Sequence, residues 1–152
     1  LFENLDLDFQ DDHVIMRGDS NNSLKYWYSD PSVVTTVSKA IEMPPCEVKF
    51  SISSEQLSDI TKAAATIGAP DMVLENGDLR VTDKKNDTAN SYSMNVFEDT
   101  GVDYKFWFKV ENLKLMAGTY DVSVSSNKIS NFKNTNADME YFIALEPESY
   151  YT

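Results

Sequence analysis

The chain has 152 residues, of which 41% are hydrophobic, including eight Phe, eight Tyr and two Trp. This length is typical of one ordinary domain or slightly more, and the aromatic content excludes an intrinsically disordered chain. The 13 Lys and Arg against 25 Asp and Glu give a formal net charge of −12. Such a charge argues against adhesion of the bulk surface to nucleic acid or anionic lipid, although a local basic strip is still compatible with DNA contact.

The sequence carries no signal for membrane insertion or secretion. No apolar run approaches the roughly 20 residues that a membrane helix needs, and residues 1–4 lack the basic and apolar regions of a signal peptide. The first residue is Leu1 rather than Met, so we expect a fragment or a processed product. The single cysteine, Cys46, cannot form an intramolecular disulfide, which favours a reducing cytoplasm.

Residues 1–30 are predicted to contain three antiparallel strands. Apolar and polar side chains alternate over residues 5–10, as in a strand with one buried face. Two acidic residues at 11–12 and two asparagines at 21–22 are turn signals, and they precede further strands at 13–19 and 23–29.

Residues 31–45 are predicted to form an interdomain connector. They contain Pro31, Pro44 and Pro45, no glycine and no strong hydrophobic period. Because proline fixes φ and biases the preceding residue toward extended conformations, we expect this connector to be extended rather than flexible.

A more regular pattern begins at Cys46. A strand is expected at 47–52, and Ser53 with Gln56 offers a capping box for a helix. An apolar stripe of Leu57, Ile60, Ala64 and Ile67 follows at helical spacing, and Gly68 ends the helix. The next three strands are expected at 72–75, 78–82 and 91–97, the first two joined by Asn76-Gly77, a strong signal for a type I′ hairpin turn.

The same order then repeats. We expect a strand at 104–108, a short helix at 109–116 with Val110 and Leu113 facing inward, and a helix end at Gly118. The three strands of the repeat are predicted at 120–125, 128–132 and 139–145. Two β-α-β-β-β units in succession predict an α+β fold, with antiparallel sheets that carry helices on one face.

Several strings in this order resemble the DNA sliding clamps of T-even-type bacteriophages. The similar strings are WYSDPSVV at 27–34, MPP at 43–45, SSEQL at 53–57, NLKLMAGTY at 112–120 and MEYFIALE at 139–146. The resemblance implies a DNA-clamp fold in which residues 1–30 are the remnant of a first domain and residues 46–152 form a complete second domain. A family member would carry another strand-helix unit before Leu5, and also the first strand and helix of the unit to which residues 1–30 belong. We therefore expect a closed ring only for a chain extended at its N-terminus.

A ring that slides on DNA needs positive charge in its hole without reading the base sequence, and Lys and Arg supply it by pairing with phosphates individually. The resemblance makes the two predicted helices the lining of the hole. The predicted DNA-facing residues, which lie off the apolar stripes, are Lys62, Lys109, Asn112 and Lys114. The alternative is that these are ordinary solvated residues, and Asp59 and Glu111 on the same segments weaken the positive strip.

The resemblance also implies an apolar pocket between the connector and the end of the last strand, where polymerases and clamp loaders attach. The predicted pocket residues are Ile41, Met43 and Pro44 on one side and Ala144, Leu145 and Pro147 on the other. Methionine adapts to varied partners, and an apolar groove suits a short peptide with aromatic anchors. The alternative is ordinary packing of the connector.

Residues typical of catalysis, cofactors or metals form no recognisable motif. His13 is the only histidine and lies in a predicted strand, while Cys46 is interpreted as a small buried hydrophobe. The acidic residues between 6 and 12 alternate with apolar ones and lack the glycine of a calcium loop, so they are interpreted as the solvated side of a strand. We predict a protein that is not an enzyme and binds neither cofactor nor metal.

The predicted function is therefore that of a phage-type sliding clamp, a processivity factor that encircles double-stranded DNA and tethers the replicative polymerase. Its expected partners are DNA without sequence specificity, a DNA polymerase, a clamp loader and further copies of the subunit in a trimeric ring, with no membrane. The expected location is the cytoplasm of the phage host. The alternative is a β-rich viral structural or carbohydrate-binding module, for which acidic charge and many aromatic residues are equally normal.

Overall fold

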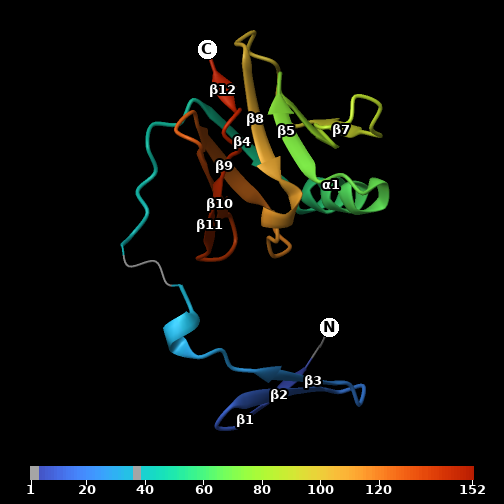
Figure 1. Ribbon diagram of the computed structural model, residues 1–152, viewed down its shortest axis with the longest axis vertical. Coiled ribbons are helices and arrows are strands. Elements are labelled where there is room, and N and C mark those ends of the chain that lie inside the picture. Colours follow the sequence, from blue (N-terminus) through green and yellow to red (C-terminus); the bar gives the residue numbers. More distant parts are fainter. Residues whose placement is uncertain (1–3, 36–38) are drawn as a thin grey trace. The chain divides into compact units, whose positions relative to one another are not determined.

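The computed structural model describes residues 4–35 and 39–152 (Figure 1). The chain divides into two compact units, Leu1–Ala40 and Ile41–Thr152. Residues 1–3 of the predicted first domain and 36–38 of the predicted connector lie outside the described residues. No helix in the described part of the chain is long and apolar enough to cross a membrane.

The first unit contains the three predicted strands. β1 (Leu5–Phe9), β2 (His13–Gly18) and β3 (Ser23–Trp27) form an antiparallel sheet in the order β1-β2-β3. The connector differs from the expectation at its start, because Pro31–Val33 forms a 3₁₀ turn, η1. The Asp30 side chain accepts a hydrogen bond from the backbone N–H of Ser32 at 2.8 Å, which caps this turn in place of extended chain.

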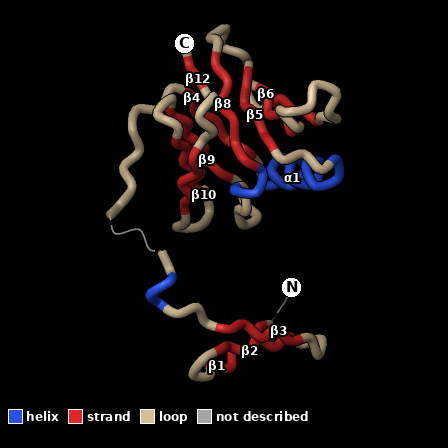
Figure 2. The backbone as a smooth tube through the Cα atoms, in the orientation of Figure 1, coloured by secondary structure: helices blue, strands red, loops and turns tan. Residues whose placement is uncertain are grey.

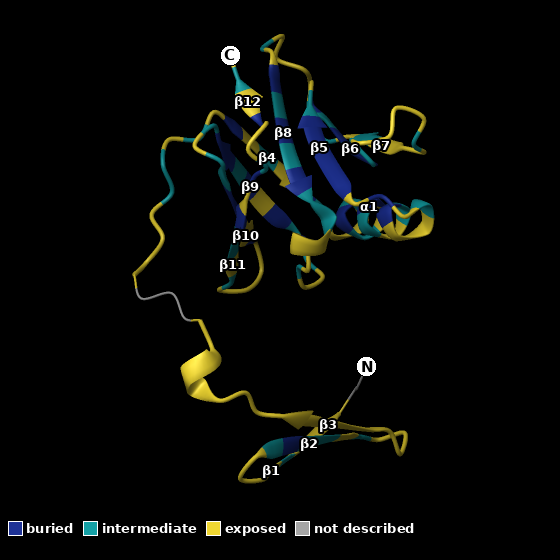
Figure 3. Ribbon diagram, in the orientation of Figure 1, coloured by how far each residue is buried: buried dark blue, intermediate teal, exposed yellow. Residues whose placement is uncertain are grey.

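The sheet of the first unit has one apolar face. The register places Leu7 beside Met16 and Met16 beside Leu24, while Asp8 and Arg17 point to the other face and form an ion pair. The large side chains of this apolar face that are exposed are Leu5, Leu7, Phe9, Leu24 and Tyr26. Figure 3 shows that most of this sheet is exposed, unlike the central strands of the second unit, such as β5 and β8.

The second unit begins with the expected strand-helix-three-strand repeat. Its elements are β4 (Val48–Ile52), α1 (Ser54–Ile67), β5 (Asp71–Glu75), β6 (Asp78–Thr82) and β7 (Tyr92–Asn95). Both halves of the capping box form, since the Ser53 hydroxyl accepts from the Gln56 N–H and the Gln56 side chain accepts from the Ser53 N–H. Gly68 ends the helix with a φ of 66°. Asn76 and Gly77 have φ values of 51° and 78°, which confirms the predicted hairpin turn.

The second repeat lacks the predicted helix. Its elements are β8 (Tyr104–Lys109), the 3₁₀ turn η2 (Val110–Asn112), β9 (Tyr120–Ser125), β10 (Ile129–Asn134) and β11 (Glu140–Ala144). The prediction of a helix at 109–116 is wrong. Lys109 ends β8 because it pairs with Asp71 across the β5–β8 ladder, and the short segment left before Gly118 has no side-chain cap. A two-residue strand that the sequence did not predict, β12 (Tyr150–Tyr151), then pairs with β8.

The two repeats exchange their first strands. One sheet has the order β11-β10-β9-β4 and the other β12-β8-β5-β6-β7, so that β4 pairs with the strands of the second repeat and β8 with those of the first. Figure 2 shows the two sheets with α1 as the one long helix of the described residues. The repeats therefore form one interlocked α+β domain and not two independent modules.

One hydrophobic core joins both sheets to α1. Alternate residues of β8, Phe106 and Phe108, are at most 1% exposed, whereas the intervening Trp107 is only partly buried. Core residues that the two sheets and the helix contribute include Ile52, Ile60, Leu74, Leu79, Tyr120 and Val124. The buried hydroxyl of Tyr104 accepts the backbone N–H of Gly77 at 2.9 Å, which fixes the hairpin turn to this core.

Candidate nucleic-acid face and partner groove

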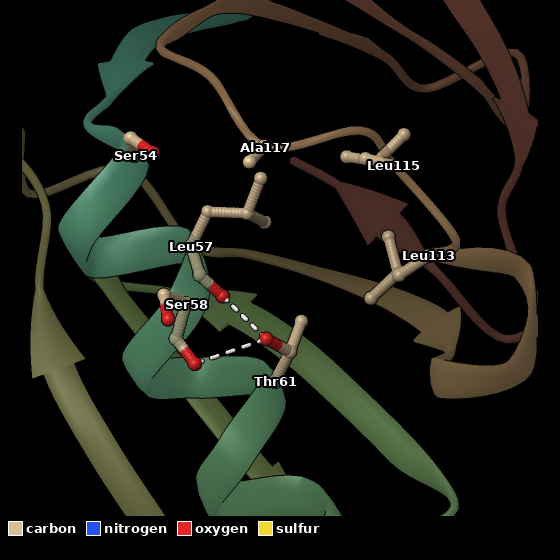
Figure 4. Close-up of a pocket in the computed structure, with 7 residues that line it drawn as sticks. All are labelled: Ser54, Leu57, Ser58, Thr61, Leu113, Leu115 and Ala117. Carbon is tan, nitrogen blue, oxygen red and sulfur yellow. Dashed lines mark hydrogen bonds between the residues drawn. The ribbon is translucent and has the colours of Figure 1, made fainter. Parts of the chain in front are cut away.

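A groove lies beside α1 where the second repeat has an irregular segment and not a helix (Figure 4). Its volume is about 260 Å³. The residues that line it are Ser54, Leu57, Ser58 and Thr61 from α1 and Leu113, Leu115 and Ala117 from the segment after η2. Leu57 and Leu113 are each 7% exposed and belong to the core, so the base of the groove is part of the core surface.

The Thr61 hydroxyl on the helical wall of this groove is already bonded. Its Oγ1 donates to the carbonyl oxygens of Leu57 at 2.8 Å and Ser58 at 3.0 Å, as the dashed lines of Figure 4 mark. Ser54 follows the N-cap of α1 and is exposed, and Ser58 is half-buried. The groove therefore combines an apolar base with a hydroxyl-bearing wall.

Two of the predicted DNA-facing lysines flank the groove in sequence. Lys62 follows Thr61 on α1, and Lys114 lies between Leu113 and Leu115; both lysines are exposed. Asn112, at the end of η2, is also exposed. Contact of these three residues with DNA stays a prediction.

Lys109 occupies a different environment from the other three. It lies on the face of β8 opposite Phe108, and Phe108 contributes to the core against α1. Its Nζ donates to Oδ1 of Asp71 at 2.6 Å and lies 3.8 Å from Oε2 of Glu146. The expectation that Lys109 lies on a helix beside Lys114 is wrong, and its predicted phosphate contact is untested and now competes with an ion pair.

The two sides of the predicted partner pocket, the connector and the end of the last strand, are both hydrogen-bonded to the turn between β9 and β10. The carbonyl oxygen of Pro45 accepts from the Ser125 hydroxyl at 2.8 Å, and the Leu145 N–H donates to the carbonyl oxygen of Lys128 at 2.9 Å. The turn between β9 and β10 thus contacts both sides. Of the connector residues, Ile41 is exposed, while Met43 and Pro44 are half-buried.

Ala144 is the last residue of β11, and the side chain of Leu145, the next residue, lies on the opposite face. Leu145 is 6% exposed and belongs to the core, whereas Ala144 and Pro147 are exposed. Side chains alternate along a strand, so Phe142 shares the face of Ala144, and Ile129 pairs directly with Ala144 in the ladder. Both are half-buried and were missed by the sequence analysis, although the two-residue period of residues 140–144 contained the signal for Phe142.

A cluster of ionic groups holds the chain that follows this strand. Lys84, on the loop between β6 and β7, donates to Glu146 at 3.0 Å, pairs with Glu148 and lies 3.8 Å from Asp71. Burial alone lowers the pKa of Lys84, but the hydrogen bonds that it donates to Glu148 and Glu146 outweigh this effect and raise the pKa. The hydrogen bond from Lys84 lowers the pKa of Glu148.

Sequence comparison connects this arrangement with a known family. The model of the gp45 sliding clamp, C-terminal part, matches residues 48–147, which span both exchanged repeats. The chain is also 32% identical over 156 aligned residues to the sliding clamp of Vibrio phage KVP40, covering 96% of this chain and 70% of that protein. The chain belongs to the gp45 sliding clamp family.

Solved structures of other sliding clamps share the fold at low sequence identity. The DNA polymerase III β subunit of Pseudomonas aeruginosa is 11% identical with a TM-score of 0.52, over 93% of this chain and 42% of that one. Proliferating cellular nuclear antigen of Entamoeba histolytica is 17% identical with a TM-score of 0.50, over 93% and 63%. The A. fulgidus homologue, bound to the C-terminal region of FEN-1, is 16% identical with a TM-score of 0.52, over 95% and 64%.

These comparisons decide between the two predicted functions. They confirm the clamp fold, the resemblance to phage clamps and the prediction that the protein is not an enzyme, since this family is non-enzymatic. The alternative of a structural or carbohydrate-binding module is rejected. This clamp chain spans less than two thirds of the length of the three solved relatives named above.

Proposed function

We propose that this clamp chain is part of a ring that encircles double-stranded DNA and tethers the replicative DNA polymerase of a phage in its host's cytoplasm. The observation that carries the proposal is the family match over residues 48–147, which coincides with the interlocked domain of exchanged repeats. Attachment is topological, so the protein needs no base-specific contacts.

Lys62 and Lys114 hold the DNA loosely in this proposal. They are exposed and flank the groove beside α1, and each pairs with one phosphate at a time without reading sequence. Asn112 adds a neutral contact from η2. Lys109 contributes less to DNA contact in this proposal, because its ammonium already forms an ion pair with Asp71.

Residues 1–30 belong to a further clamp domain, and residues 31–45 connect it to the second unit. Support comes from the apolar face of the sheet β1-β2-β3, which carries large exposed side chains, among them Phe9 at 69%. Such a face is normally covered in a stable protein. Three complete subunits close the ring, because a closed ring needs both interface edges on every subunit.

The polymerase and the clamp loader bind a groove between the connector and β11. Ile41, Met43 and Pro44 form one side, and Ala144 and Pro147 the other, with Ile129 and Phe142 on the same sheet face as Ala144. Leu145 supports this groove from the core and does not line it. A short peptide with apolar anchors suits such a surface.

The test is binding to the DNA polymerase of Vibrio phage KVP40, measured by biolayer interferometry with the polymerase immobilised. We expect saturable binding that a C-terminal peptide of the polymerase competes away. Phe142→Ala weakens it, while the control Tyr92→Ala, an exposed aromatic residue on β7 of the other sheet, does not. Failure of this clamp chain to bind either that polymerase or its peptide would contradict the proposal.

A further inference from the structure

We propose that Lys84 is a positioning residue that holds residues 146–149 against β8 and so sets the shape of one side of the partner groove. This inference rests on the groove of the proposed function. Lys84 itself lies outside the predicted pocket, on the loop that follows β6.

The ammonium of Lys84 links two segments that are far apart in sequence. Its side chain is 14% exposed and faces Glu146 at 3.0 Å, Glu148, and Asp71 at 3.8 Å. Asp71 is 1% exposed, and its Oδ2 accepts from the backbone N–H of Lys84 at 3.2 Å, while its Oδ1 accepts from Lys109. Lys84 is therefore fixed to the sheet through Asp71 and holds the two glutamates from that position.

The glutamates belong to a segment whose main chain follows the edge of β8. The Glu146 N–H donates to the carbonyl oxygen of Trp107 at 2.8 Å, and the Trp107 N–H donates to the Ser149 hydroxyl at 2.8 Å. The Ser149 N–H donates to the Glu146 carbonyl oxygen at 3.0 Å, which closes a turn. Pro147 lies inside this turn, and so the turn determines where that groove residue sits.

Removal of the Lys84 charge takes away the cation that bonds both Glu146 and Glu148, and leaves Lys109, which bonds Asp71 and lies 3.8 Å from Glu146, as the positive charge near them. Asp71 keeps Lys109, and its place in the β5–β8 ladder prevents it from moving. Glu148 has a side chain 47% exposed and follows Pro147 directly. Lys109 is too far from Glu146 for a hydrogen bond, so the two carboxylates repel each other more strongly and are better solvated by water, and the turn at 146–149 is the part expected to open.

The experiment compares Lys84→Met with Lys85→Met, which removes the same charge from the neighbouring exposed residue; no ion pair of Lys85 is found among the described residues. Hydrogen exchange at the amides of Glu146 and Ser149 measures the turn. Titration with the C-terminal peptide of the KVP40 polymerase measures the groove. We expect Lys84→Met to accelerate both exchanges and to weaken peptide binding about tenfold, the scale of coupling through a contact network.

Conservative replacement separates positioning from general stability. Lys84→Arg keeps the charge, so it should restore most of the affinity and of the exchange protection, and Lys85→Met should change neither. Unchanged exchange in Lys84→Met overturns the inference. Faster hydrogen exchange in Lys84→Met with unchanged peptide affinity also overturns the inference. In that case, if Phe142→Ala still loses peptide binding, the proposed groove is supported without a role for Lys84. If the unmodified protein does not bind the peptide, the groove itself is wrong.

Discussion

Asp71 and Lys109 form a partly buried ion pair at the end of the β5–β8 ladder, with 2.6 Å between Oδ1 and Nζ. At the corresponding end of the β4–β9 ladder, the other repeat places Ile52 beside Tyr120, both at most 1% exposed. The internal repeat is thus kept in the strand pairing, while the chemistry at the two ends differs. One end is apolar and the other is ionic.

The first prediction concerns this ion pair. Asp71→Ala removes the buried one of the two carboxylates that Lys84 and Lys109 share, the other being Glu146, and breaking a buried pair by removal of one partner costs about 3–5 kcal/mol. Urea unfolding should show a loss of that order in the free energy of unfolding. Asp59→Ala, on the exposed face of α1, is the matched control and should change it by less than about 0.5 kcal/mol. Equal effects of the two substitutions would contradict the assignment.

Local signals in the sequence were enough to predict the elements whose causes are local. The capping box at Ser53, the left-handed Gly68 and the Asn76-Gly77 turn each depend on neighbouring residues, and the structure confirms all three. The helix expected at 109–116 failed because Lys109 is recruited by Asp71, 38 residues earlier. The residues next to Lys109 in the sequence give no sign that Asp71 is its partner.

In the candidate site too, features with local causes could be predicted and features that depend on tertiary contacts could not. Exposure of Lys62 and Lys114 followed from their positions off the apolar stripes. The side of β11 that is proposed to face a partner depends on which face the core occupies, and the sequence analysis placed Leu145 in the predicted pocket without separating it from Ala144. The ionic cluster around Lys84 joins loop, strand and chain end through tertiary contacts alone, so it could not be predicted.

The second prediction follows from the burial of Leu145. Leu145→Ala removes a core side chain and should lower the free energy of unfolding by about 2–4 kcal/mol, as cavity-forming substitutions do. Differential scanning calorimetry measures the corresponding fall in Tm. Phe142→Ala, on the other face, should lower the free energy of unfolding by less. It should weaken binding of the polymerase peptide by about 1–3 kcal/mol. The roles of these two residues are reversed if Leu145→Ala affects only peptide binding.

The third prediction tests the start of α1. Ser53→Ala removes the acceptor for the Gln56 N–H, which lies 3.1 Å from the hydroxyl, and should cost about 1 kcal/mol of stability. Ser54→Ala, at the next and exposed position, is the matched control and should be nearly neutral. Chemical denaturation of both variants gives the comparison. A similar cost for the two serines would mean that the capping box adds nothing specific.

The fourth prediction is a pH dependence of the turn at 146–149. Lys84 holds the pKa of Glu148 below the ordinary glutamate value of about 4.3. A group with a lowered pKa in the folded state contributes stability above its unfolded pKa, and this contribution is lost as the pH falls through the folded value. Attachment of the turn should be constant near neutrality and weaken below about pH 4.

Trp107 reports on that turn, since its backbone bonds both Glu146 and Ser149. Its fluorescence can be followed during acid titration in a Trp27→Phe background. Glu148→Gln should reduce the change seen in the acid range, because it removes the titrating group but keeps the side-chain shape. An identical acid transition with and without Glu148 would assign the change to other carboxylates.

The last prediction concerns DNA. Lys62→Ala combined with Lys114→Ala should flatten the salt dependence of DNA association, by up to about two phosphate contacts in the slope of log K against log salt. The reason is that each lysine that neutralises a phosphate releases a counterion condensed on the DNA, so the slope counts phosphate contacts. Peptide binding should be unaffected, because neither lysine lies in the partner groove. Lys49→Ala, on the solvent-facing side of β4 opposite Val48, is the matched control for a lost surface charge. A slope that changes equally in the control would remove α1 and the segment after η2 from the DNA-facing surface.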